Sequence, residues 1–193
     1  MRITVWKTIT YFILLVRRVV RYAEMQRLRS EMKFCGKNFR IDYGSQVEHP
    51  EFITICDDVT INSHAWLSIV TLLGKKEPSL EIARGTYIGR FATISCANRI
   101  VIEEDVLISD RVFITDVYHG FQDTTLPVSS QPLYSPGPVE IGSGTWLGIG
   151  VSVMPNVKIG KHCVIGANAV VTHDIPDYHV AAGVPARIIR RID

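Results

Sequence analysis

His119 and two nearby aspartates are the residues of this sequence whose types and spacing offer acid–base chemistry. Asp116 stands three positions before His119, and Asp123 stands four positions after it. An imidazole gains or loses a proton close to neutral pH, so such a group can serve as a general base. A lone histidine can equally be a satisfied core or surface group, and residue types alone leave both interpretations open.

The other histidines and the cysteines show no pattern that indicates chemistry. We interpret five histidines as structural, although one of them, His64, could face an acceptor site: His49, His64, His162, His173 and His179. The four cysteines contain no CxxC pair and do not cluster with histidines: Cys35, Cys56, Cys96 and Cys163. We therefore expect free thiols in a reducing compartment and no metal site.

A repeat between Ile141 and Pro176 must build the scaffold that positions these residues. It consists of six consecutive six-residue units, IGSGTW, LGIGVS, VMPNVK, IGKHCV, IGANAV and VTHDIP. Each unit opens with an aliphatic residue, and a small or aliphatic residue follows four positions later. This period fits neither an α-helix, around which the apolar position would drift, nor a hairpin, because no turn separates the units.

Short strands wound into a coil satisfy this period. If three units make one triangular turn, each opening aliphatic residue points inward and stacks on its counterpart in the next turn, as in a parallel β-helix. Glycines follow the opening residue in four units, where we expect a tight corner: Gly142, Gly148, Gly160 and Gly166. The period covers most of residues 55–176, or about five turns, and is interrupted at 68–79, 98–101 and 119–140.

The N-terminal segment differs from the repeat in its charge and in its expected structure. Residues 1–40 hold ten Lys or Arg against two Glu, a net charge of +8, and the remainder holds eleven against seventeen, a net charge of −6. Residues 3–29 are expected to be helical, with an apolar run too short to span a bilayer. Two interpretations stay open: a helix packed on the coil or on a neighbouring copy, or a basic amphipathic segment on an anionic membrane. No stacking face of aromatic and basic residues accompanies the charge, so we expect no nucleic-acid partner.

These patterns divide the chain into three parts. A basic helical segment at 1–33 precedes an all-β parallel β-helix at 34–176, and a short C-terminal extension follows at 177–193. Residues 34–50, where the period is poorly formed, are expected to cap the first edge of the coil. The loop at 119–140 contains four prolines, and we expect it to be an ordered arm that shapes a site. A content of 47% hydrophobic and 21% charged residues is ordinary for a globular protein.

Three stretches of the sequence resemble the hexapeptide-repeat acyltransferases, above all the bacterial polysaccharide and lipopolysaccharide O-acetyltransferases related to the maltose and galactoside acetyltransferases. They are ITDVYHGFQD at 114–123, the run from Thr145 to Pro176, and AAGVPARIIR at 181–190. The resemblance implies a left-handed coil and a homotrimer with active sites between subunits. It also implies direct transfer of an acetyl group from acetyl-CoA to a sugar hydroxyl, without a metal, in cell-surface polysaccharide biosynthesis. Such an enzyme would be cytoplasmic, and the segment at 1–33 could add peripheral contact with the inner face of the membrane.

The resemblance assigns roles to individual residues. His119 stands at the family's catalytic position as the general base, and Asp116 and Asp123 are expected to fix the tautomer of its imidazole and favour the protonated form. The main-chain N–H of Ile149, after Gly148, is the expected donor to the oxyanion. The residues expected to bind CoA are Trp146, Gly148, Ile149, Ala167, Thr172, Arg187 and Arg190.

The sequence departs from the family pattern at two positions and leaves alternatives open. Val117 stands where some relatives carry a second histidine, and Ile149 stands where a small or hydroxylated residue is common. Trp146 could be a subunit contact, and the two arginines could be solvated surface charges. A γ-type carbonic anhydrase would need a closely spaced histidine pair, which is absent from the sequence. The alternative functions are a non-catalytic scaffold at the membrane and an acetyltransferase acting on a free sugar, an amino sugar or an antibiotic.

Overall fold

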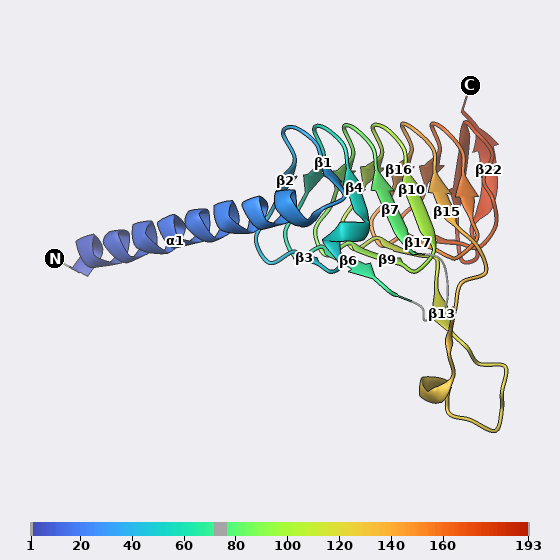
Figure 1. The fold of residues 1–193 in the computed structure, drawn as a ribbon. Helices are drawn as coiled ribbons and strands as arrows, with labels where there is room; N and C mark the ends of the chain where they lie inside the picture. Colours follow the sequence, from blue (N-terminus) through green and yellow to red (C-terminus); the bar gives the residue numbers. More distant parts are fainter. Residues whose placement is uncertain (1, 72–76, 193) are drawn as a thin grey trace.

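The computed structural model describes residues 2–71 and 77–192, and it shows a three-sided coil of short strands (Figure 1). Helix α1 (Arg2–Glu31) projects from one end of the coil, and an arm leaves its side near β13 (Tyr118–His119). Two single-turn 3-10 helices complete the elements outside the sheets: η1 (Pro50–Phe52) and η2 (Val128–Ser130). The prediction of stacked parallel strands behind an N-terminal helix is confirmed.

Three sheets form the faces of the coil, and their strands follow one another in turn along the chain. The first sheet contains β1 (Phe34–Cys35), β4 (Ile53–Ile55), β7 (Ser79–Ile82), β10 (Arg99–Ile102), β15 (Val139–Ile141) and β18 (Lys158–Ile159). The second contains β2 (Arg40–Ile41), β5 (Thr60–Ile61), β8 (Tyr87–Ile88), β11 (Leu107–Ile108), β16 (Trp146–Leu147), β19 (Val164–Ile165), β21 (His179–Ala182) and β22 (Arg187–Arg191). The third contains β3 (Gln46–Val47), β6 (Trp66–Ile69), β9 (Thr93–Cys96), β12 (Phe113–Thr115), β17 (Ser152–Val153) and β20 (Val170–Val171).

Consecutive turns pair in register, so the inward positions of one turn lie on those of the next. In the first sheet, Ile82 pairs with Ile102, which pairs with Ile141, which pairs with Ile159. All four side chains are fully buried. Burying each contributes about 1.5–3 kcal/mol, and strands of two to five residues depend on this stacking because none is stable alone. The predicted inward direction of the opening aliphatic residues is confirmed.

The glycines after the opening residues were predicted to turn tight corners, but the structure requires them for another reason. A Cβ on Gly142 would lie 2.6 Å from the carbonyl carbon of Gly160 in the next turn, so these glycines let successive turns approach. The left-handed backbone that turns the corner occurs two residues later, at Gly144 (φ 68°) and Gly150 (φ 70°). The second residue of the unit therefore permits stacking, and the fourth turns the chain.

Both ends of the coil are covered by other parts of the chain. Leu28, near the end of α1, and Met32, directly after it, are buried in the same hydrophobic core as the first turns. At the other end, β21 adds to the second sheet in parallel, and β22 pairs with it antiparallel. Within residues 34–50, which were expected to cap the first edge, β1, β2 and β3 form a complete first turn of the coil itself.

Residues in excess of the six-residue period gather at one edge of the coil, between the third and first sheets. There the chain inserts the segment before β4, residues 70–78 between β6 and β7, two residues between β9 and β10, and the arm between β12 and β15. We call this the loop edge. The corners between the second and third sheets hold four residues each, and we call that line of corners the smooth edge. Gly74, Lys75 and Lys76, in the predicted loop at 68–79, lie outside the described residues.

Candidate active site

His119 lies on the loop edge at the root of the arm. Its strand β13 pairs antiparallel with β14 (Leu133–Tyr134), and His119 stands opposite Leu133. The ring of Tyr118 contacts the rings of Phe121 and Tyr134, with centroid distances of 5.9 and 5.4 Å, so the base of the arm is packed. His119 is exposed, and its imidazole forms no hydrogen bond with the described residues. Both ring nitrogens are therefore available to a ligand.

Asp116 has a structural role instead of the predicted one beside the imidazole. Its side chain is fully buried; Oδ1 accepts the main-chain N–H of Ala97 at 2.7 Å, and Oδ2 accepts those of Asn98 and Arg99 at 2.9 and 2.7 Å. Burial raises the pKa of Asp116, although the N–H donors act in the opposite direction. The carboxylate thus holds the two extra residues between β9 and β10, and no hydrogen bond joins it to His119.

Asp123 is engaged within the arm. Its Oδ1 accepts the hydroxyl of Thr125 at 2.6 Å and the main-chain N–H of Thr125 at 2.9 Å, and these bonds lower the pKa of Asp123. No hydrogen bond joins this carboxylate to the imidazole of His119 in the described part of the chain. The structure therefore gives no hydrogen bond for the predicted orientation of the ring by either aspartate.

Gln131 holds the two sides of the arm together, a role that the sequence reasoning missed. Its Oε1 accepts the N–H of Asp123 at 3.1 Å, and its Nε2 donates to the carbonyl oxygens of Asp123 and Leu126 at 2.9 and 3.2 Å. The side chain is nearly buried although the arm is otherwise exposed. The sequence signal for this role is a glutamine inside a proline-rich loop, because its side-chain amide can both donate to and accept from the main chain.

Gly148 and Ile149 form a corner on the smooth edge. Gly148 is buried, and a Cβ there would lie 2.8 Å from the main-chain nitrogen of Ala167 and from the carbonyl oxygen of Ile165. A larger residue would push the next turn away. The main-chain N–H of Ile149 donates to no acceptor within residues 2–71 and 77–192, and Ile149 is 47% exposed.

The unpaired N–H of Ile149 follows from the residue at the same place one turn later. At other corners an aspartate in the next turn accepts the equivalent N–H: Asp57 accepts from Lys37, Asp110 from Arg90 and Asp177 from Lys161. Above Ile149 that place is taken by Ala167, which has no acceptor in its side chain. An unpaired main-chain donor of an exposed residue remains at this corner, and such a donor can bind an anionic oxygen.

Four of the seven residues expected to bind CoA lie at or near this corner. Trp146 stands on the outer side of β16, 46% exposed, and its Nε1 donates to Oγ of Ser109 at 3.0 Å, which fixes the indole. Ala167 is exposed one turn beyond Ile149. The structure therefore brings Trp146, Gly148, Ile149 and Ala167 to one region of the coil.

The other three residues expected to bind CoA lie further along the chain. Thr172 is exposed after β20, and its hydroxyl is hydrogen-bonded to Nδ1 of His173 at 2.9 Å. Arg187 and Arg190 lie on the exposed strand β22, where their guanidinium groups donate to the carbonyl oxygens of Ala186 and Arg191. Neither arginine has an acidic partner among the described residues, so both charges are available to an anion.

His119 and the Ile149 corner lie on different edges of the same chain. The loop edge follows β12 of the third sheet, whereas the smooth edge precedes β17 of that sheet. A face of the coil therefore separates the predicted base from the predicted oxyanion donor. His64, which could face an acceptor, lies on the smooth edge, where its ring packs 5.1 Å from that of Phe91.

A groove of about 930 Å³ runs along the loop edge before the arm. Its walls come from the residues after α1, from η1, from β7 and the two residues before it, and from the start of β10: Lys33, Glu51, Phe52, Glu77, Pro78, Ser79, Glu81 and Arg99. In the described residues no three His, Cys, Asp or Glu side chains are grouped so as to hold a metal ion. None of the helices described is long and apolar enough to cross a bilayer.

Comparison with known sequences identifies relatives of the chain. Residues 138–173 match the model of the bacterial transferase hexapeptide (six repeats). The chain is 35% identical over 162 residues to the Probable acetyltransferase Rv3034c of Mycobacterium tuberculosis, covering 82% of this chain and 50% of that one. It is 38% identical over 110 residues to WbbJ of Escherichia coli K12, whose name provisionally assigns it to lipopolysaccharide biosynthesis as an O-acetyl transferase, covering 54% and 56% of the two chains. It is 32% identical over 179 residues to the galactoside O-acetyltransferase of Escherichia coli K12, covering 84% of this chain and 80% of that one.

The fold also has counterparts among solved structures. AntD, an N-acyltransferase from Bacillus cereus in complex with dTDP and 3-hydroxybutyryl-CoA, superimposes with a TM-score of 0.73 at 20% identity over 88% of both chains. The chain spans about half the length of the first two curated relatives and four-fifths of the third.

Proposed function

Because the chain belongs to the hexapeptide-repeat acyltransferase family, we propose that it transfers an acetyl group from acetyl-CoA to a hydroxyl of a sugar, with His119 as the general base. The observation that carries this proposal is the exposed, unpaired imidazole of His119 at the root of a packed arm. A base that must receive a proton from a bound substrate needs this freedom, and none of the described residues occupies the ring.

The reaction requires a proton acceptor and a donor to the oxyanion. The imidazole of His119 takes the proton of the sugar hydroxyl while the hydroxyl oxygen attacks the thioester carbonyl carbon. The main-chain N–H of Ile149 donates to the carbonyl oxygen as it becomes negative. The C–S bond then breaks, and the imidazolium of His119 returns the proton to the sulfur of CoA. Acetyl-CoA supplies the acetyl group, and Trp146, Ala167, Thr172, Arg187 and Arg190 are proposed to bind the remainder of the molecule.

The proposed site needs more than one chain. His119 lies on the loop edge and Ile149 on the smooth edge, with a face of the coil between them, which supports a site that takes the two groups from different chains. In a ring of copies, the loop edge of one chain meets the smooth edge of the next. We therefore include in the proposal a homotrimer of left-handed coils, which the family resemblance implies and which closes such a ring.

The acceptor is proposed from the names of the relatives. One acts on a galactoside, and another is assigned to lipopolysaccharide biosynthesis, so a saccharide of the cell surface is the proposed acceptor class and the cytoplasm the proposed compartment. The groove along the loop edge, which carries Lys33 and Arg99 opposite acidic side chains, offers polar contacts to a sugar.

Replacing His119 tests the proposal. We expect His119→Ala to lower kcat by ~10²–10⁴ while KM for acetyl-CoA changes little, because the imidazole acts on the acceptor. CoA release with a panel of sugar acceptors measures this effect, and amino-sugar acceptors in the same panel distinguish O-acetyl from N-acetyl transfer. The control is His162→Ala, whose ring stacks on Tyr178 at another corner and should leave kcat unchanged. An active His119→Ala enzyme would end the assignment of the base.

A further inference from the structure

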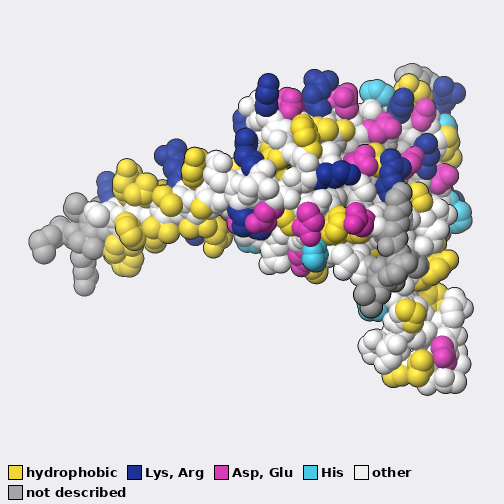
Figure 2. Space-filling model, viewed as in Figure 1, with side chains coloured by type: hydrophobic (Ala, Val, Ile, Leu, Met, Phe, Trp, Pro, Cys, Tyr) yellow, Lys and Arg dark blue, Asp and Glu magenta, His cyan; other side chains and the backbone are white. Residues whose placement is uncertain are grey.

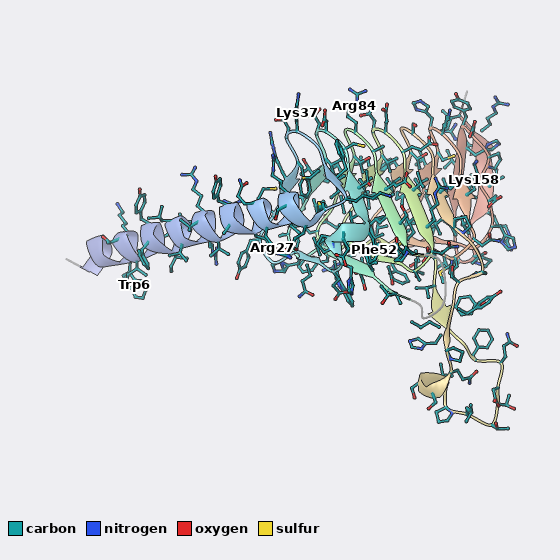
Figure 3. The ribbon with its side chains drawn as sticks, viewed as in Figure 1. Trp6, Arg27, Lys37, Phe52, Arg84 and Lys158 are labelled. Atoms are coloured by element: carbon teal, nitrogen blue, oxygen red, sulfur yellow. The ribbon has the colours of Figure 1, made fainter. Side chains whose placement is uncertain are left out.

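The outer part of helix α1 carries large apolar side chains that no other part of the described chain covers. In Figure 2 they appear as a yellow rod beside the coil, broken by patches of Lys and Arg. Trp6 lies toward the free end of the helix, and Arg27 lies where the helix meets the coil (Figure 3). The exposed apolar residues, between 42% and 71% accessible, are Trp6, Ile9, Tyr11, Phe12, Ile13, Leu14, Leu15, Val16, Val19, Val20 and Tyr22. A surface of this size on a single helix is typical of an interaction site.

The apolar and basic residues of this helix lie on opposite sides. At 3.6 residues per turn, all of these apolar residues except Leu14 fall within an arc of about 220°, which we call the apolar face. The remaining sector, the basic face, carries four of the five basic residues that precede Glu24: Lys7, Arg17, Arg18 and Arg21. Trp6, Tyr11 and Tyr22 fall at the borders of the apolar face, where a ring with a polar atom suits the boundary between lipid and water.

The basic face is the side of the helix that turns toward the coil. Nη1 of Arg21 lies 3.2 Å from Oδ1 of Asp42, and the guanidinium of Arg17 lies 5.5 Å from the centre of the Tyr43 ring. Leu28, which packs in the core, projects in the same sector, roughly opposite to the middle of the apolar face. The apolar face therefore points away from the coil.

We propose that α1 binds an anionic lipid surface and lies along it. The apolar face enters the boundary between headgroups and acyl chains, and the basic face stays at headgroup level beneath the coil. Charge complementarity selects this occupant, since the segment before Glu24 contains five basic residues and no acidic one. Each basic residue near such a surface strengthens binding severalfold.

A second copy of the helix fits these features less well. A helix that packs on its copy through a coiled-coil seam needs a narrow apolar stripe flanked by charges of both signs. Here the apolar face is far wider than such a stripe, and like helices would bring only positive charges together. The ion pairs of Arg27 with Glu24 and Glu31 occur only in the last turns, next to the coil. The outer helix has no such pairing groups of its own.

Vesicle flotation of the full-length protein tests the proposal without measuring activity. We expect binding to vesicles of equal parts phosphatidylcholine and phosphatidylglycerol, and weak binding to phosphatidylcholine alone. The double variant Lys7→Glu/Arg18→Glu should bind the anionic vesicles at least about 30-fold more weakly. Phe12→Ser/Val16→Ser should weaken binding at least about tenfold through the apolar face. All four residues are exposed, so circular dichroism and thermal unfolding of the coil should stay unchanged.

The matched control is a variant with the same change of net charge on the coil instead of on α1. Lys37→Glu/Arg84→Glu alters the net charge equally, and both side chains are exposed on a row of corners away from α1 (Figure 3). This variant should bind as the wild type does. Equal binding to both vesicle types, or equal weakening by both charge variants, would overturn the proposal. So would a lower molar mass of Phe12→Ser/Val16→Ser in lipid-free light scattering, because the apolar face would then join copies of the chain.

Discussion

At the scale of single residues, the two aspartates close to His119 in the sequence show how the surroundings of a carboxylate decide its role. Asp116 and Asp123 lie at similar distances from His119 in the sequence, yet one is buried against main-chain donors and the other faces water. A buried carboxylate with three N–H partners uses its oxygens to hold the main chain, and it does not orient the imidazole of His119. We infer that His119 relies on substrate or on a neighbouring chain for its orientation.

The role of Asp116 can be tested by an amide replacement. Asp116→Asn should lower the free energy of unfolding by about 2 kcal/mol, because the new NH₂ group would face the N–H groups of Asn98 and Arg99 without an acceptor. Urea unfolding measures the change. Asp123→Asn is the control, since its exposed carboxylate bonds only within the arm, and its unfolding midpoint should stay close to that of the wild type. Similar midpoints for the two variants would contradict the structural role of Asp116.

At the scale of elements, the arm is an ordered structure held by very few contacts. Gln131 supplies three hydrogen bonds across it, and the aromatic rings around Tyr118 pack its base. Because most of the arm is exposed, we infer that its order depends mainly on these two groups and on the pairing of β13 with β14. The position of His119 at the base then depends on the same packing.

Removing the hydrogen bonds of the Gln131 side chain should make the arm more mobile and leave the coil folded. Gln131→Leu keeps a similar volume but removes the three hydrogen bonds, so limited proteolysis should cleave within 120–132 at least about tenfold faster than in the wild type. Thermal unfolding of the coil should shift little. Ser129→Ala, at an exposed position of η2, is the control and should be cleaved at the wild-type rate. An unchanged rate for Gln131→Leu would show that the arm is held by other contacts.

The sequence predicted the coil well because its information is local and repeated. Ile82, Ile102 and Ile141 follow a period, and the period alone places them inward. The hydrogen-bond partners of Asp116 and Gln131 could not be predicted. Both side chains bind residues of insertions, and an insertion has no repeat from which the positions of its residues could be inferred. The first turn was hard to detect in the sequence because its inward residues Cys35, Ile41 and Val47 are only partly buried. A position that is only partly buried need not be aliphatic, so the six-residue period is less regular there.

At the scale of the whole molecule, the separation of His119 from the Ile149 corner governs how the proposed enzyme works. If the base and the oxyanion donor come from different chains, then an isolated chain has no complete site. Association would then be a condition of activity as well as of stability.

Mixing two inactive variants tests this arrangement. His119→Ala lacks the base, and Gly148→Ala disturbs the oxyanion corner because its Cβ would lie 2.8 Å from the nitrogen of Ala167. Each should be inactive alone, whereas co-expression in equal amounts should restore about one quarter of the wild-type activity, the chance that two neighbouring chains supply one intact part each. Light scattering checks that both variants assemble. Mixed assemblies without activity would place the whole site within one chain.

The covered ends of the coil have a consequence for the length of the molecule. Parallel sheets with open first and last rungs would accept the rungs of another chain, and growth could continue into a fibre. Helix α1 closes one end, and at the other the antiparallel β22 presents three arginines along the edge of the second sheet. Positive charges on such an edge repel a second copy. Further chains are thus kept from adding to the ends of the coil. The coil can become longer only if evolution adds repeats to the sequence.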